Sequence, residues 1–197
     1  VLLPLFSGHA ARGDHDAIRR AIDHALRMLL FVMAPAAVGL WALSTPIVRA
    51  SFEWRAFDAQ STLLTARALK CYAFGLLVFS LSKVFVPAFY AMQDTRTPVR
   101  VGVCTVLLNM AMSITFMLTW PLHYKHAGIA SATVIAELIS GLWLAALLHR
   151  RLGSLGWRSI AQSIGRSLVC AGLMGGAIRL LHFALLALSL AAGWSAK

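Results

Sequence analysis

The sequence predicts an all-α, polytopic membrane helix bundle with about five transmembrane helices and an N-terminal stub. Three observations predict this class. Of the 197 residues, 59% are hydrophobic and 13% are charged, whereas soluble domains average about 45–50% and about 25%. Stretches of about 20 residues with at most one or two charges recur along the chain, and each is long enough to cross the hydrocarbon. Lys and Arg outnumber Asp and Glu by 18 to 7, and basic loops between apolar spans are typical of membrane proteins.

The same numbers exclude several classes. A disordered chain needs low hydrophobicity, and a soluble nucleic-acid-binding protein would carry its basic residues on a charge-rich fold. The alternating ten-residue strands of a membrane barrel are absent. We therefore expect membrane lipid, and no nucleic acid, to be a partner of the chain.

The positions of the charged residues predict the elements of the N-terminal part of the chain. Residues 1–8 are expected to be the end of a transmembrane helix. Residues 9–27 are expected to form a cytoplasmic amphipathic segment, because Ile18, Ile22 and Leu26 recur at helical spacing. Residues 28–48 contain no charge and form the first complete span. Residues 49–70 are expected to be a periplasmic loop in which Asp58 or Ser61 caps a short helix.

The remaining elements are assigned in the same way. The second span (71–92) contains one charge, Lys83, and is followed by a cytoplasmic turn (93–100). The third span (101–122), a short periplasmic loop (123–126) and the fourth span (127–148) come next; Glu137 is the one charge of the fourth span. A cytoplasmic loop (149–166) then leads to a fifth span (167–192), which contains Arg179 and His182.

The basic residues predict an orientation. Ten Lys and Arg residues lie in one set of alternating loops and five in the other. By the positive-inside rule the first set is cytoplasmic, which places the turn at Asp94 inside and the segment 49–70 outside. The ten are Arg12, Arg19, Arg20, Arg27, Arg96, Arg100, Arg150, Arg151, Arg158 and Arg166, and the five are Arg49, Arg55, Arg67, Lys70 and Lys125.

Lys83 is the strongest candidate for a functional residue. A charge within a span costs several kcal/mol and usually faces the bundle interior or a watery cavity. Ser80, Lys83, Pro87 and Tyr90 fall on one helical face. This pattern predicts a polar stripe that offers Lys83 to an anionic substrate, although a lysine that snorkels or pairs structurally is the alternative.

Two further polar features leave alternatives open. Glu137 is expected at a depth similar to that of Lys83, and could pair with it, be protonated, or bind a proton or cation. Asn109, with Thr105 and Ser113 one turn away on either side, could line a cavity or make helix–helix hydrogen bonds.

The motifs of catalysis and cofactor binding are absent from the sequence. There is no phosphate-binding glycine loop, dinucleotide fingerprint or H-E-x-x-H motif. The three cysteines are far apart in apolar stretches, without metal-ligand spacing. We expect no catalytic residues, no cofactor and no metal, and a transporter rather than an enzyme.

Several short strings of the sequence follow one another in a fixed order and spacing. They begin at Leu2, Ala10, Leu26, Ala34, Ala56, Thr65, Lys83, Gln93, Pro121 and His126. In this order and spacing the strings resemble the MurJ/MviN family of lipid II flippases of bacterial inner membranes. The similarity is clearest over residues 1 to about 150, and most specific in the stretch from Lys83 to Val99.

The resemblance implies a fourteen-helix, two-lobe fold of the multidrug/oligosaccharidyl-lipid/polysaccharide exporter type. This chain would supply the end of the eighth helix through the thirteenth, and the N-terminal lobe would lie outside it. The implied activity is movement of undecaprenyl-pyrophosphate-linked peptidoglycan precursor from the inner to the outer leaflet by alternating access. Multi-pass insertion in the bacterial inner membrane is implied as well, and cell-wall synthesis proteins are possible partners.

The resemblance also assigns residues. Lys83 matches the lysine of the family's motif in the second span of this chain, and Arg27 matches the arginine that begins the first. The turn motif is Asp94, Thr95, Arg96, Thr97 and Pro98, and Pro98 suits the first turn of the next helix. Arg55 stands where the family usually has glycine, and Glu137 is not part of the family pattern. Two other functions are weighed: another exporter of the superfamily, moving polysaccharide-lipid or drugs, and a membrane scaffold without transport.

Overall fold

A computed structural model describes Phe6 and residues 15–52, 58–121, 124–153, 162, 165–167, 169–177 and 180. Within these residues the chain forms helices joined by short turns, and no strand, which confirms the all-α class. Four of the described helices are long and apolar enough to cross a membrane. The helices with assigned bounds are α2 (His15–Ala42), α3 (Ser44–Phe52), α4 (Ala59–Ala91), α5 (Arg96–Thr119) and α6 (Lys125–Leu152).

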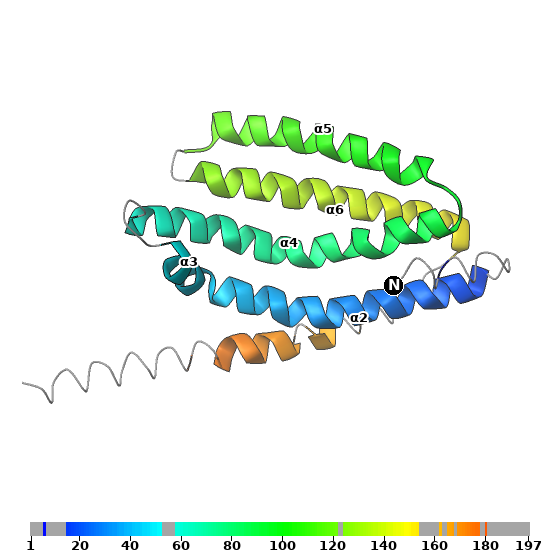
Figure 1. Cartoon of the computed structure of the whole chain (residues 1–197), viewed down its shortest axis with the longest axis horizontal. Coiled ribbons are helices and arrows are strands. Elements are labelled where there is room, and N and C mark those ends of the chain that lie inside the picture. The colour runs from blue at the N-terminus through cyan, green and yellow to red at the C-terminus, as the bar shows by residue number, and fades with distance from the viewer. Residues whose placement is uncertain are drawn as a thin grey trace, which may run out of the picture.

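The four long helices lie side by side in the order α5, α6, α4, α2, and the short α3 lies beside the start of α4 (Figure 1). Helices α4 and α6 run in one direction, and α2 and α5 run in the other. The start of α2, the α4–α5 turn and the end of α6 therefore share one end of the bundle. Six of the arginines expected in cytoplasmic loops lie on these segments and so gather toward that end: Arg19, Arg20, Arg96, Arg100, Arg150 and Arg151.

Helix α2 differs from the sequence prediction, which divided it at residue 28 into an interfacial segment and a span. It is one continuous helix of 28 residues. Ile18, Ile22 and Leu26, expected to lie on the membrane surface, are buried in the core. Their helical spacing was correctly recognised, but an apolar face serves equally well to pack on another helix, and α4 supplies that partner.

The first predicted span also ends earlier than its lack of charge suggested. Helix α2 stops at Ala42, and α3 begins at Ser44. Pro46 explains the break, because its ring would clash with the carbonyl of Ala42 one turn earlier and it has no N–H to donate there. The Ser44 hydroxyl donates to the Trp41 carbonyl oxygen at 3.0 Å, which satisfies an acceptor at the break.

Helix α4 occupies more than half of the segment that the sequence assigned to a periplasmic loop. Asp58 is its N-cap and accepts a hydrogen bond from the Ser61 N–H at 2.8 Å, and the helix then continues for 33 residues. Because Arg67 and Lys70 are charged, the sequence prediction began the span only after them. In the structure both residues are part of α4 and lie on its surface. Their charged groups lie over the rings of Tyr124 and Trp41, at 5.0 and 5.7 Å from the centroids.

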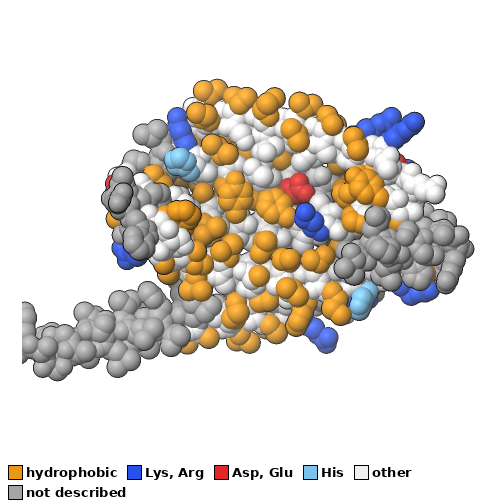
Figure 2. All heavy atoms as spheres, viewed as in Figure 1, with side chains coloured by type: hydrophobic (Ala, Val, Ile, Leu, Met, Phe, Trp, Pro, Cys, Tyr) orange, Lys and Arg blue, Asp and Glu red, His pale blue; other side chains and the backbone are white. Residues whose placement is uncertain are grey.

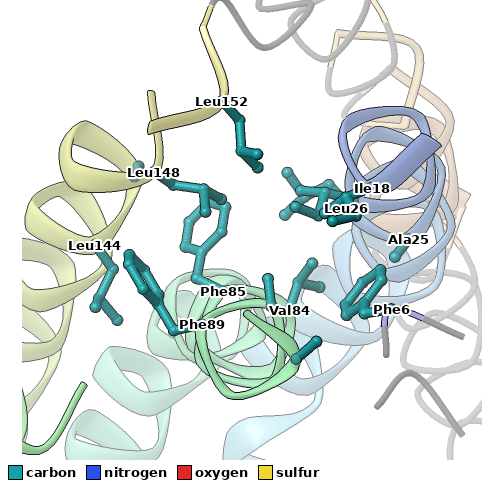
Figure 3. Close-up of a cluster of buried hydrophobic side chains, with 14 of the residues drawn as sticks. Phe6, Ile18, Ala25, Leu26, Val84, Phe85, Phe89, Leu144, Leu148 and Leu152 are labelled. Atoms are coloured by element: carbon teal, nitrogen blue, oxygen red, sulfur yellow. The ribbon is translucent and has the colours of Figure 1, made fainter. Parts of the chain in front are cut away.

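The hydrophobic core lies where α2, α4 and α6 meet (Figure 3). Ile18 and Leu26 of α2 point toward Val84 and Phe85 of α4, and Leu148 of α6 closes the other side. Farther along, α4 and α6 approach closely at Gly75, where a Cβ atom would lie 2.6 Å from Cγ2 of Val134. Tight packing at small residues is how helices associate in lipid.

Helix α5 lies at one edge of the row of described helices, and it packs on α6 (Figure 1). Its outward side is apolar and exposed, as at Val106, Met110 and Leu118. Such a surface suits lipid tails. Three predicted segments lie largely outside the described residues. They are the fifth span (167–192), the loop 149–166 and the stub 1–8.

Candidate functional site

A groove between α4 and α6 carries the two ionisable residues that the sequence placed inside spans. It has a volume of about 560 Å³ and is lined by Phe79, Ser82, Lys83, Val86 and Pro87 of α4 and Glu137 of α6. Acidic and basic side chains are visible in the middle of an otherwise largely apolar face over these helices (Figure 2). A second groove, of about 450 Å³, has no Lys, Arg, Asp or Glu among the described residues that line it.

Lys83 presents its charge to this groove. The residue is exposed, and no carboxylate oxygen of the described residues lies within 4 Å of its ammonium group. Because α4 begins earlier than predicted, Lys83 lies halfway between the middle of its helix and its C-terminal end, about 12 Å from Ala91 along the axis. Pro87 follows one turn later and has no N–H to donate to the Lys83 carbonyl.

Glu137 reaches the groove from α6, and its partner there is Ser82. The Ser82 hydroxyl donates to Oε1 of Glu137 at 2.5 Å, which links the two helices. The sequence predicted that Glu137 and Lys83 lie at a similar depth, and the structure brings both to one groove without an ion pair between them. Ser82 was not among the predicted site residues. The signal for it was available, because a half-buried carboxylate in a span requires a hydrogen-bond donor.

The other sequence candidates lie elsewhere. Ser80 is buried, and its hydroxyl donates to the Leu77 carbonyl within α4 at 2.6 Å. Arg27 forms an ion pair with Asp23 on the surface of α2 and does not line the groove. Asn109 lies between α5 and α6, where its Oδ1 accepts from the hydroxyls of Ser113 at 3.3 Å and Thr133 at 3.4 Å. The structure therefore supports helix–helix bonding for Asn109.

The predicted turn motif ends α4 and begins α5. Gln93 has a φ of 60°, and the N–H groups of Gln93 and Asp94 donate back to the carbonyls of Tyr90 and Phe89, which forms a Schellman ending. The Asp94 carboxylate then accepts from the N–H of Thr97 at 3.0 Å and from its hydroxyl at 2.7 Å. One side chain thus caps the first turn of α5.

Asp94 also forms an ion pair with α6. Arg151, which the sequence did not single out for a site, lies 2.6 Å from Oδ2 of Asp94, and its guanidinium lies 5.7 Å from the centre of the Phe89 ring. The hydrogen bonds from Thr97, with a smaller contribution from Arg151, hold the pKa of Asp94 below its ordinary value of 3.8. The carboxylate is therefore ionised at neutral pH and links α4, α5 and α6 at one end of the bundle.

The groove suits an amphiphilic anion. The ammonium group of Lys83 can form charge-assisted hydrogen bonds with phosphate oxygens. Phe79, Val86 and Pro87 supply apolar surface beside that charge.

Comparison with known proteins identifies the family. The sequence profile described as "Lipid II flippase MurJ" matches residues 1–190. The chain belongs to the MurJ lipid II flippase family. This confirms the resemblance seen in the sequence, and it disfavours the two alternatives, another exporter and a scaffold. As a MurJ-family chain with four described helices able to cross a membrane, it is a multi-pass membrane protein.

The relatives of the MurJ family that the chain matches are longer than the chain itself. A probable lipid II flippase MurJ of Rhizobium tropici is 36% identical over 179 residues, which cover 90% of this chain and 33% of the relative. A lipid II flippase MurJ of Burkholderia cenocepacia is 33% identical over 178 residues, 88% of this chain and 34% of the relative. The chain thus spans about a third of the length of these relatives.

A solved MurJ structure shows the same fold. The chain described as "Lipid II flippase MurJ, inward closed conformation" superposes with a TM-score of 0.70 at 24% identity, covering 96% of this chain and 43% of the other. The described helices of this chain therefore have the arrangement of part of a MurJ transporter.

The Asp94 cap leads to a pH-dependent prediction. In the full-length MurJ-family protein, Asp94→Ala should destabilise the fold by about 1 kcal/mol at pH 7 through loss of the cap. Because the pKa of Asp94 is lower in the folded protein than in the unfolded chain, this stabilisation is complete at neutral pH and is lost as the pH falls through the folded-state pKa. Thermal unfolding followed from neutral to strongly acid pH should show the difference from wild type shrinking.

The matched control for this prediction is Thr95→Ala, because the Thr95 side chain makes no capping hydrogen bond. It should unfold like wild type across the same pH range. A loss in Thr95→Ala as large as that in Asp94→Ala, or a loss in Asp94→Ala that does not change with pH, would contradict the assignment of the cap.

Proposed function

We propose that the full-length protein is a flippase, and not an enzyme, in the bacterial inner membrane. It moves undecaprenyl-pyrophosphate-linked peptidoglycan precursor from the inner to the outer leaflet. The observation that carries the proposal is the groove of a MurJ-family chain in which Lys83 stands beside apolar walls. The pyrophosphate supplies the anion for the ammonium group, and the isoprenoid chain supplies apolar carbon for Phe79, Val86 and Pro87.

The rest of the protein completes the binding site. An ionisable residue in a spanning helix faces a cavity or another part of the protein more readily than lipid. The α4–α6 face carries two such residues, whereas the outer side of α5 carries exposed apolar ones. We therefore place the N-terminal lobe and the substrate cavity on the side of the groove, and lipid on the side of α5. Rocking of the two lobes about this cavity would expose the substrate to each leaflet in turn.

A depletion experiment tests the function. In bacteria depleted of their own lipid II flippase, the full-length protein should restore growth and prevent accumulation of the lipid-linked precursor in the inner leaflet. Residues 1–197 expressed alone should restore neither, since they supply about a third of the length of their relatives. Failure of the full-length protein, present at normal membrane levels, would count against the proposal.

A further inference from the structure

Lys83 and Glu137 line one groove, yet no ion pair joins their charged groups. Opposite charges attract strongly where water is scarce, so a free carboxylate beside Lys83 would be expected to pair with it. In the structure the Glu137 carboxylate is bonded to the Ser82 hydroxyl at 2.5 Å, and no ion pair between Lys83 and any described carboxylate is present.

The helix geometry explains why the Ser82 hydroxyl, and not the Lys83 ammonium group, contacts Glu137. Ser82 and Lys83 are consecutive residues of α4, so their side chains leave the helix about 100° apart. The hydroxyl points to α6 and meets Glu137, while the ammonium group faces the open groove. A hydrogen bond to an ionised acceptor is about twice as strong as one between neutral groups. The bond from Ser82 can therefore hold Glu137 on the α6 side.

We propose that Ser82 is a positioning residue, which restrains the Glu137 carboxylate and so keeps the Lys83 ammonium available to an anionic lipid headgroup. The inference rests on the proposed function. Without the Ser82 hydroxyl, Glu137 turns toward Lys83 and competes with the phosphate for it. With the hydroxyl in place, the Glu137 carboxylate does not neutralise the charge of Lys83.

Binding to the purified full-length protein tests this role. The probe is undecaprenyl pyrophosphate, and undecaprenol, which has the same chain but no charge, is the control ligand. Ser82→Ala should bind the pyrophosphate about tenfold more weakly, which corresponds to about 1.4 kcal/mol, and should bind undecaprenol like wild type. Ser82→Thr keeps the hydroxyl and should retain most of the affinity. Ser80→Ala is the matched control, because this serine bonds only to its own helix, and it should leave binding unchanged.

The decisive variants remove the competing charge. Glu137→Gln alone should bind undecaprenyl pyrophosphate more tightly than wild type, since an anionic group has left the groove. Ser82→Ala combined with Glu137→Gln should recover at least the wild-type affinity, although the original hydrogen bond is still missing. A purely structural hydrogen bond predicts no such recovery.

The outcomes separate this inference from the proposed function. Wild-type affinity in Ser82→Ala, a double variant as weak as Ser82→Ala, or weaker binding by Glu137→Gln would each overturn the role of Ser82 while leaving a Lys83-dependent flippase intact. A wild-type protein that binds undecaprenyl pyrophosphate no better than undecaprenol would overturn the proposed function, and the role of Ser82 with it.

Discussion

Replacing Lys83 by alanine in the full-length protein is expected to abolish growth of cells that depend on it, with the variant present in the membrane at wild-type levels. The change removes the one cation among the described residues that line the α4–α6 groove. A hydrogen bond to a charged group is worth about 1.5–3 kcal/mol, which corresponds to about a 10- to 100-fold loss in binding. Lys83→Glu should be at least as severe, because it places a second carboxylate where the phosphate would bind. Growth complementation and membrane immunoblots measure the two quantities.

Lys70→Ala is the matched control for this change. Lys70 lies on the same helix, but its ammonium group contacts the ring of Trp41 rather than the groove. Cells that carry Lys70→Ala should grow normally. Normal growth with Lys83→Ala or Lys83→Glu would contradict the assignment of Lys83 to the substrate, and would favour a lysine that only snorkels to the membrane surface.

Gly75→Leu is expected to cause the largest loss of stability. A Cβ atom at this position would already lie 2.6 Å from Cγ2 of Val134 and 3.1 Å from the ring of Phe79. A leucine adds three more carbons between α4 and α6, so the two helices must separate along the face that forms the groove. Overpacking typically costs about 1–3 kcal/mol, and we expect the upper end of this range here. Thermal unfolding of the full-length protein in detergent measures the loss.

Gly102→Leu provides the comparison at a glycine in α5. A Cβ atom at Gly102 has no neighbour within 4 Å, so the larger side chain should be accommodated and should leave the thermal midpoint near that of wild type. Equal losses in the two variants would show that the close approach of α4 and α6 at Gly75 does not limit the packing.

The fold class could be predicted from the sequence because lipid imposes a simple rule. Spanning segments must satisfy their own backbone hydrogen bonds, so long apolar stretches become helices. Each of the first four predicted spans overlaps a described helix that is long enough to cross a membrane. The helix ends could not be read from charge alone. Arg67 and Lys70 extend α4 as surface residues, while the uncharged first span is broken before Pro46.

The candidate site could be predicted only in part. Lys83 and Glu137 were recognisable because each is an isolated charge in an apolar stretch. Whether they paired could not be known, since it depends on which residue of α4 contacts Glu137 across the α4–α6 interface. That residue is Ser82, one position before Lys83. In the same way Asp94 was recognised within a turn motif, but its ion pair with Arg151 joins residues 57 positions apart and depends on the packing of α6.

The central claim is that this MurJ-family protein uses Lys83 to carry a lipid-linked pyrophosphate across the membrane. The most direct test is translocation of fluorescent lipid-linked precursor in vesicles that contain the purified full-length protein. Wild-type protein should move the lipid between leaflets faster than protein-free vesicles do, and Lys83→Ala should be no faster than protein-free vesicles. Translocation by Lys83→Ala at the wild-type rate, or a wild-type rate equal to that of protein-free vesicles, would contradict the claim.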